Sequence, residues 1–248
     1  MLGVIGGSGL DRFEELQITD HKVVDTPYGS PSAALTFGTL QRQSLVFLPR
    51  HGHDHSIAPH RINYRANLWA LHAQGVRELV AVAAVGGITM PMETGMLVVP
   101  DQIIDYTHGR ETTFFDGITN PLQHVDFTMP FSAVLRKRLL DAGHATRLRL
   151  HDGGTYGATQ GPRLETAAEI DRMERDGADI VGMTGMPEAV LARELGMDYA
   201  MLAVVVNAAA GRGDSTSEIS MAEIQAVAEA GMRQVRRIIQ TMEINGGR

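Results

Sequence analysis

The chain has 248 residues, of which 44% are hydrophobic and none is cysteine, and its formal net charge is −7 at pH 7. A negative chain of this kind argues against general binding to nucleic acid or a membrane surface, because both need basic patches. The lack of cysteine excludes disulfides and thiolate metal sites. We see no signal-peptide pattern and no apolar stretch long enough to span a bilayer, so we expect a cytoplasmic protein without membrane or nucleic-acid partners.

Short apolar runs alternate with helical patterns along the chain. Strands are predicted at residues 3–6, 44–48, 78–85, 180–183 and 199–206, and further short apolar runs lie at residues 96–99 and 103–104. Helices are predicted at residues 62–74, 165–175, 186–195 and 219–242, and glycines follow the first three. No linker-like stretch divides residues 1–248, and continuous apolar strands flanked by helices favour a sheet covered on both faces. The sequence therefore predicts a single α/β domain with a mixed central β-sheet flanked by helices.

Two polar residues stand at the ends of predicted elements. Asn207 ends the apolar run at residues 199–206, and Glu165 opens a predicted helix. An amide donates and accepts hydrogen bonds, whereas a carboxylate only accepts, so together they could bind a ligand edge with an N–H beside a carbonyl, as a 6-oxopurine presents. The alternative is an Asn that closes a turn and a Glu that caps a helix.

The first two strands end in groups that suit an anion. The glycines around Ser8 let the backbone approach a ligand, although the spacing lacks the third glycine of a dinucleotide-binding loop, and a tight turn remains the alternative. Arg50 and His51 follow the second strand and can donate to an oxyanion. The histidines that follow raise the question of a metal, but no metal-binding helix motif is present, and we predict no metal site.

The third strand ends with small residues, Ala83 and Ala84, followed by two glycines, which leave room for a flat ligand or simply form a turn. Another strand-to-helix junction carries Met183 and Thr184. The hydroxyl of Thr184 can cap the helix or hold an anion, and Met183 offers an adaptable apolar surface.

Taken in order, these segments resemble the trimeric purine nucleoside phosphorylase and methylthioadenosine phosphorylase family over nearly the whole chain. The matching segments are Ile5-Gly-Gly-Ser-Gly-Leu, Asp25-Thr-Pro-Tyr-Gly, Arg50-His-Gly, Asn63-Tyr-Arg-Ala-Asn, Phe114-Phe-Asp-Gly, Gly161-Pro-Arg and Met183-Thr-Gly-Met-Pro-Glu. The resemblance implies phosphorolysis, in which phosphate attacks the ribosyl C1′ and displaces the purine. It also implies that no metal or organic cofactor is needed, that a nucleoside and phosphate are the partners, and that the protein is a homotrimer.

Site roles are carried over by position. The residues that match the phosphate site are Ser8, Arg50, His51 and Thr184, assisted by the backbone at Ala83 and Ala84. The residues that match the nucleoside site are Met183 under the sugar and Glu165, Asn207, Ala208 and Ala209 around the purine, with Glu165 and Asn207 as catalytic residues.

The purine positions differ from those of the methylthioadenosine enzymes. Those enzymes carry aspartates at the positions of Asn207 and Ala209 and a serine at Glu165, whereas this chain has the Glu and Asn pair of the 6-oxopurine phosphorylases. Glu165 can accept the N1–H of hypoxanthine, but N1 of adenine is an acceptor. A site built to pair a ligand N–H can reject a mismatched ligand by factors of about 10⁴.

The sugar positions indicate a different relative. Where 6-oxopurine nucleoside enzymes have a histidine for the 5′-hydroxyl, the register here gives Met221, with Ile219 or Ser220 as alternatives. A thioether packs on a methylthio group and is a poor partner for a hydroxyl. His124 matches the histidine that reaches the 5′ end of a neighbouring subunit's substrate, which makes the expected active site intersubunit.

The two halves combine into one expected substrate, a 6-oxopurine on 5-methylthioribose. The rivals are an inosine/guanosine phosphorylase, an adenine-directed methylthioadenosine phosphorylase, and a non-catalytic nucleoside-binding protein of the same fold.

Overall fold

The computed structural model describes residues 1–7, 10, 13, 15–41, 43–118, 120–216 and 221–242. Its strands are β1 (Leu2–Gly6), β2 (Gln17–Lys22), β3 (Leu35–Leu40), β4 (Gln43–Pro49), β5 (Glu78–Gly87), β6 (Leu97–Val99), β7 (Gln102–Asp105), β8 (Leu150–Asp152), β9 (Thr155–Ala158), β10 (Ile180–Gly182) and β11 (Asp198–Ala208). Its helices are α1 (Tyr64–Ala73), α2 (Ala133–Thr146), α3 (Ala167–Asp176), α4 (Gly185–Glu194) and α5 (Met221–Thr241), with a 3-10 turn at Pro59–Arg61.

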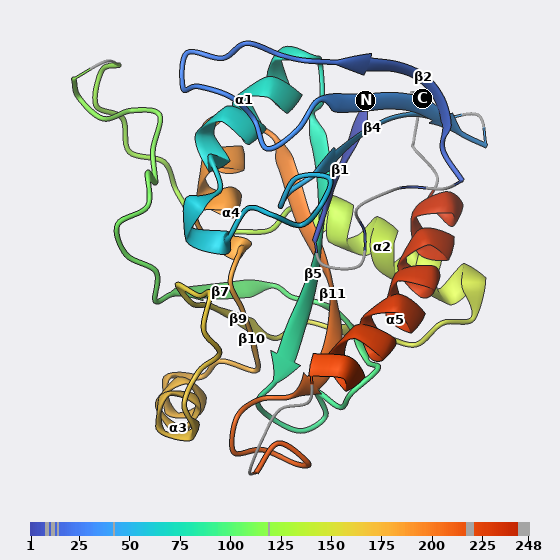
Figure 1. Cartoon of the computed structure of the whole chain (residues 1–248), viewed down its shortest axis with the longest axis vertical. Helices are drawn as coiled ribbons and strands as arrows, with labels where there is room; N and C mark the ends of the chain where they lie inside the picture. The colour runs from blue at the N-terminus through green and yellow to red at the C-terminus, as the bar shows by residue number, and fades with distance from the viewer. Residues whose placement is uncertain are drawn as a thin grey trace.

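The strands form one mixed sheet in the order β2-β3-β4-β1-β5-β10-β9-β7, and β11 pairs with both β5 and β6. The two longest strands, β5 and β11, run parallel through the centre of the molecule (Figure 1). The expected mixed central sheet flanked by helices is confirmed.

Each face of the central strands is covered by a different pair of helices. Along β11, Met201, Ala203 and Val205 pack with α1 and α4, whereas Leu202 and Val204 pack with α2 and α5. The two pairs lie on opposite sides of the sheet in Figure 1. Because side chains alternate along a strand, a continuous apolar run is what a strand buried on both faces requires.

Most predicted elements are present, with ends that differ by a residue or two. The largest correction near the site concerns the helix predicted from Glu165. Thr166 and Glu169 form a capping box, in which each side chain accepts from the other's backbone N–H, and this makes Thr166 the N-cap of α3. Glu165 therefore lies in the loop before the helix.

A long segment without helix or strand connects β7 to α2 and carries His124. Its green ribbon stands away from α1 and α4 at the upper left of Figure 1. Glu194 of α4 anchors its base, because the carboxylate accepts from the Thr113 hydroxyl and the Phe114 N–H, each at 2.7 Å. Beyond this anchor, Ile118 is 92% and Leu122 68% exposed.

Among the helices that the structure describes, none combines the length and apolar character needed to cross a bilayer.

Candidate active site

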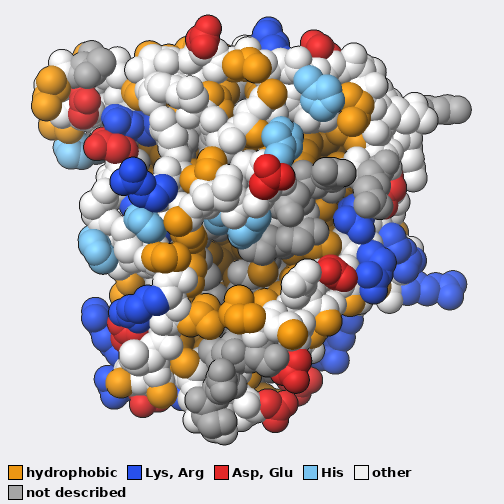
Figure 2. Space-filling model, in the orientation of Figure 1, with side chains coloured by type: hydrophobic (Ala, Val, Ile, Leu, Met, Phe, Trp, Pro, Cys, Tyr) orange, Lys and Arg blue, Asp and Glu red, His pale blue; other side chains and the backbone are white. Residues whose placement is uncertain are grey.

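The sheet forks at the end of β5. β1 pairs with β5 only as far as Ala81, and β10 joins the opposite end of that strand at Gly86 and Gly87. Ala83 and Ala84 lie between these two pairings, where they are bonded to β11 on one edge only. A fork between diverging strands is where ligands bind in open α/β sheets. Figure 2 shows hydrophobic and histidine side chains gathered around a hollow in the middle of one face.

A β-bulge places Asn207 beside this fork. The register of β11 on β5 shifts between Val205 and Asn207, so that Asn207 pairs with Gly86. On its other edge, Gly86 pairs with Val181 of β10. The Nδ2 group of Asn207 donates to Ala208 O at 2.6 Å. Asn207 and Ala208 are half-buried and Ala209 is buried, so the predicted purine residues follow one another at one sheet edge.

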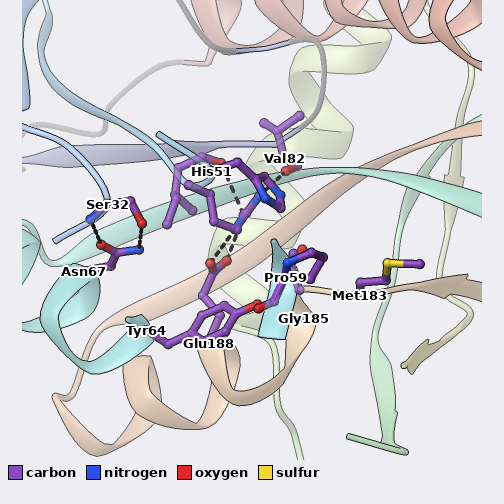
Figure 3. Close-up of polar contacts among 12 residues, drawn as sticks. Ser32, His51, Pro59, Tyr64, Asn67, Val82, Met183, Gly185 and Glu188 are labelled. Carbon is purple, nitrogen blue, oxygen red and sulfur yellow. Dashed lines mark hydrogen bonds and ion pairs between the residues drawn. The ribbon is translucent and has the colours of Figure 1, made fainter. Parts of the chain in front are cut away.

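Arg50 is fully buried at the end of β4 and is held by an ion pair. Its Nε and Nη2 groups donate to the two carboxylate oxygens of Glu188 at 2.6 and 2.9 Å, and Nη1 donates to Val82 O at 2.9 Å. In Figure 3 the Glu188 carboxylate points toward the part of the site that holds His51 and Val82. A Cβ at Gly7 would lie 3.0 Å from Nη1 and 2.7 Å from Val82 O, so the loop can pass this close only with glycine.

Glu188 balances the charge of Arg50. Burial alone would lower the pKa of Arg50, but the carboxylate of Glu188 raises it above its usual range. Glu188 also accepts from the Tyr199 hydroxyl at 2.9 Å. The pKa of Tyr199 is raised by burial and then by the Glu188 charge, so the hydroxyl stays protonated. The pair is electrically neutral overall, and its geometry is fixed by three segments distant in sequence.

His51 lies beside Arg50 and is neutral at pH 7. Burial lowers its pKa to about 4, and the neighbouring Arg50 charge adds to this. Its Nδ1 atom is 2.8 Å from Ile57 O, a contact in which the neutral ring donates. The Nε2 atom is then an acceptor, which suits a ligand that carries a proton on oxygen.

Met183 and Thr184 follow β10 directly. A Cβ at Gly161 would meet the Met183 sulfur at 2.5 Å, so these two loops touch. Thr184 is buried and is the N-cap residue of α4, but its side chain makes no cap hydrogen bond. The capping alternative for Thr184 is therefore wrong. Glu188 follows Thr184 by one helical turn, which connects the Met183–Thr184 junction to the Arg50 ion pair.

Glu165 is bound by a residue that the sequence did not single out. The Thr159 hydroxyl donates to Glu165 Oε1 at 2.7 Å. Both residues line a cavity of about 360 Å³, together with Tyr106, Gly161 and Met173. This volume is within the usual range for small-molecule sites. The cavity does not extend to Arg50 or Asn207.

Arg110 joins the walls of the site. Its Nη1 donates to Met183 O at 2.8 Å and to Met186 O at 2.6 Å, and its Nη2 donates to Thr159 O at 3.1 Å. The guanidinium also lies over the Tyr64 ring at 5.4 Å. A single side chain thus ties the loop after β9 to the loop after β10. The sequence alone does not show these contacts, since the partners of Arg110 are 46 or more residues away and those of Glu188 are 138 and 11 residues away.

Two predicted residues are not joined to the rest of the site within the described part of the chain. Met221 begins α5 and is 65% exposed, and His124 is exposed in the segment after β7. No hydrogen bond links either one to Glu165 or Met183. Ser8, and the alternatives Ile219 and Ser220, lie outside the described residues.

Among the described residues, no group of three or more histidine, aspartate or glutamate side chains is placed to hold a metal ion. The histidines that raised this question include His55, whose ring lies 4.3 Å from that of His51.

Comparisons with known proteins identify the family of this chain. The family model of the phosphorylase superfamily matches residues 1–242. A probable S-methyl-5'-thioinosine phosphorylase of Pseudomonas syringae pathovar tomato is 51% identical over 233 residues, 94% of each chain. A 6-oxopurine nucleoside phosphorylase of Pyrococcus furiosus is 46% identical over 215 residues, 85% of this chain and 80% of that protein. The solved methylthioadenosine phosphorylase of Schistosoma mansoni in complex with adenine superposes with a TM-score of 0.92 at 30% identity, covering 97% of this chain and 90% of that one. The chain belongs to the phosphorylase superfamily.

Proposed function

We propose that this chain catalyses the phosphorolysis of S-methyl-5'-thioinosine to hypoxanthine and 5-methylthioribose 1-phosphate. A phosphate oxygen forms a bond to C1′ while the bond from C1′ to N9 breaks, and both electrons of that bond leave with the purine, which then takes up a proton. Inorganic phosphate is a co-substrate, and the reaction uses neither a metal nor an organic cofactor. The proposed setting is the cytoplasm.

The proposal rests on Glu165, which Thr159 holds at the cavity, and on Asn207, which the β-bulge sets beside Gly86. Glu165 Oε1 accepts from Thr159, which leaves Oε2 as an acceptor for a ligand N–H. A 6-oxopurine offers that N–H at N1, and an adenine does not. Asn207 can donate to N7 or O6, where negative charge develops as the purine leaves, so its bond strengthens in the transition state. The probable S-methyl-5'-thioinosine phosphorylase at 51% identity supports the same substrate.

The phosphate would lie in the fork of the sheet, beside Arg50, His51 and Thr184, with Ser8 and the backbone at Ala83 and Ala84 assisting. Because Glu188 neutralises Arg50, binding would rest on directed hydrogen bonds more than on excess charge. The Nε2 atom of His51 would accept a hydrogen bond from the hydroxyl that phosphate carries. Met183 would lie under the sugar.

The 5′ end of the sugar would be completed by a second copy of the chain. We infer a homotrimer with intersubunit active sites, in which His124 reaches a neighbour's substrate and Met221 packs on the methylthio group. In support, His124 lies on the protruding segment between β7 and α2, which also carries exposed apolar residues such as Ile118 and Leu122. Contiguous exposed apolar surface commonly marks a protein interface.

Because Met221 is exposed, one alternative function also fits the site. Without a thioether at the 5′ end, the same base and phosphate groups would serve an inosine/guanosine phosphorylase, and the relative in Pyrococcus furiosus is named a 6-oxopurine nucleoside phosphorylase. Phosphorolysis of methylthioinosine, methylthioadenosine, inosine and adenosine side by side distinguishes these possibilities. We expect methylthioinosine to have the highest kcat/KM. A preference for inosine would replace the proposal with the rival, a preference for methylthioadenosine would refute the base assignment, and no phosphate-dependent release of hypoxanthine would indicate a binding protein.

Asn207→Asp tests the base contact. The aspartate resembles that of the adenine enzymes, so the ratio of kcat/KM for methylthioadenosine to that for methylthioinosine should rise by about 10- to 150-fold, as expected for a changed hydrogen bond to a charged group. Total activity should fall. The double variant Asn207→Asp, Ala209→Asp should move the ratio in the same direction, and an unchanged ratio in both would remove Asn207 from the base site.

A further inference from the structure

We propose that Thr159 is a positioning residue that determines base specificity by fixing the carboxylate of Glu165 as an acceptor for the purine N1–H. This inference rests on the proposed function, because it assumes that Glu165 reads a 6-oxopurine. It assigns the selectivity to a pair of residues, of which only Glu165 is expected to touch the substrate.

Each polar group of Thr159 forms a hydrogen bond, so the residue is held rigidly in place. It is only 7% exposed. Its N–H donates to Gly182 O at 2.8 Å and its carbonyl accepts from Arg110 Nη2 at 3.1 Å. Its hydroxyl is then 2.7 Å from Glu165 Oε1. A hydroxyl on such a fixed backbone can act as a reference point for a more mobile side chain.

Glu165 needs such a reference. It lies in the loop before α3 and is half-buried, and the last torsion of a glutamate side chain is broad. Among the described residues, the Thr159 hydroxyl is the only group that donates a hydrogen bond to this carboxylate. With Oε1 engaged, the plane of the carboxylate is set and Oε2 is left for a ligand.

The direction of the bond follows from the proton count. The Thr159 hydroxyl has one proton and two possible acceptors, Glu165 Oε1 at 2.7 Å and Gly182 O at 3.3 Å. Gly182 O already accepts from the Thr159 N–H, so the proton goes to the nearer, charged oxygen. The carboxylate therefore meets the ligand as an acceptor held in place from behind, which matches an N–H at purine N1 and mismatches the lone pair of adenine N1.

Two matched pairs of proteins test this role. Thr159→Val replaces the hydroxyl by a methyl group of similar size and is compared with wild type. Thr159→Ala and Thr159→Ser differ from each other only by the hydroxyl, so that any packing loss cancels between them. For each protein we would measure kcat and KM for methylthioinosine, methylthioadenosine and phosphate, together with the melting temperature.

Loss of the hydroxyl should lower kcat/KM for methylthioinosine by about 10-fold, the lower end of the range for a hydrogen bond to a charged group, because Thr159 acts through Glu165. The KM for phosphate should change by no more than about twofold, and the methylthioadenosine rate should fall less than the methylthioinosine rate. Thr159→Ser should restore the wild-type ratio. If Thr159→Val does not fold, the alanine and serine pair gives the same comparison.

A double-variant cycle with Glu165→Gln separates positioning from general damage. If Thr159 acts through the carboxylate, Thr159→Val should have little further effect once Glu165 is Gln. Equal losses in both backgrounds, or unchanged base selectivity in Thr159→Val and Thr159→Ala, would overturn the proposal. Failure of the proposed function looks different, since it appears in the wild-type enzyme, as a preference for inosine or methylthioadenosine over methylthioinosine or as no phosphorolysis at all.

Discussion

The two ends of the proposed active site are built in opposite ways. At the phosphate end, Arg50 and Glu188 are both 0% exposed and are joined by a bidentate ion pair from segments 138 residues apart. At the end expected to hold the 5′ group, Met221 is 65% exposed and His124 lies on the protruding segment between β7 and α2. The difference indicates that the proposed phosphate site is preorganised within one chain, whereas the side chains proposed for the 5′ group are left exposed by the single chain.

The largest effect is expected from breaking the buried pair. Glu188→Ala leaves the Arg50 charge buried without its partner, which should lower the free energy of unfolding by about 3–5 kcal/mol. Urea denaturation measures the change. The matched control is Asp141→Ala, which breaks the pair with Lys137 whose side chains are 58% and 73% exposed. Its cost should be about 0.5 kcal/mol or less. Similar losses in both variants would show that the buried pair does not hold the phosphate end together.

A somewhat smaller change in the free energy of unfolding should follow from lowering the pH, through His51 beside Arg50. The unfolded chain binds a proton at His51 below pH 6.5, whereas burial delays protonation in the folded protein to about pH 4. The folded state is therefore destabilised as the pH falls from 6.5 to 4, by up to about 3 kcal/mol from this residue. Denaturation of wild type and His51→Gln at pH 7 and pH 4.5 should show a smaller acid loss in the variant. Parallel losses would place the acid sensitivity elsewhere.

The smallest effect is expected at the 5′ end. Met221→His exchanges an apolar contact for a hydrogen-bonding group, so inosine should gain on methylthioinosine by about 10-fold, the lower end for one group in an exposed pocket. Relative kcat/KM values measure this. The same substitution at Ile219 and Ser220 controls for the register. A larger swing at either control would move the 5′ contact away from Met221.

The sequence predicted the central strands well because burial on both faces leaves a continuous apolar run, as in β5 and β11. The sequence did not predict α2, because a buried charged residue interrupts the apolar spacing of this helix. Leu135, Leu139 and Ala142 follow helical spacing, but Arg138 is only 9% exposed and pairs with Glu78. The Ser132 side chain that caps this helix, accepting from Leu135 N at 3.3 Å, was the usable signal.

For the site, strand ends identified Arg50, Met183 and Asn207, because small and polar residues directly after apolar runs stand out. The partners Thr159 and Glu188 could not be found in this way. A threonine after a strand and a glutamate in the first turn of a helix have common local explanations, and only the fold brings them to Glu165 and Arg50.

The β-bulge in β11 has a consequence for how selectivity can change. Side chains alternate along a strand, so one additional residue reverses the orientation of everything that follows. Val206 is that residue, and it sets Asn207 beside Gly86. If the register continued unbroken through Val206, Asn207 would pair with Gly87 in place of Gly86, and its amide would point to the other face of the sheet. The side chain presented at the proposed purine site is thus set by the bulge in β11 as well as by the identity of residue 207.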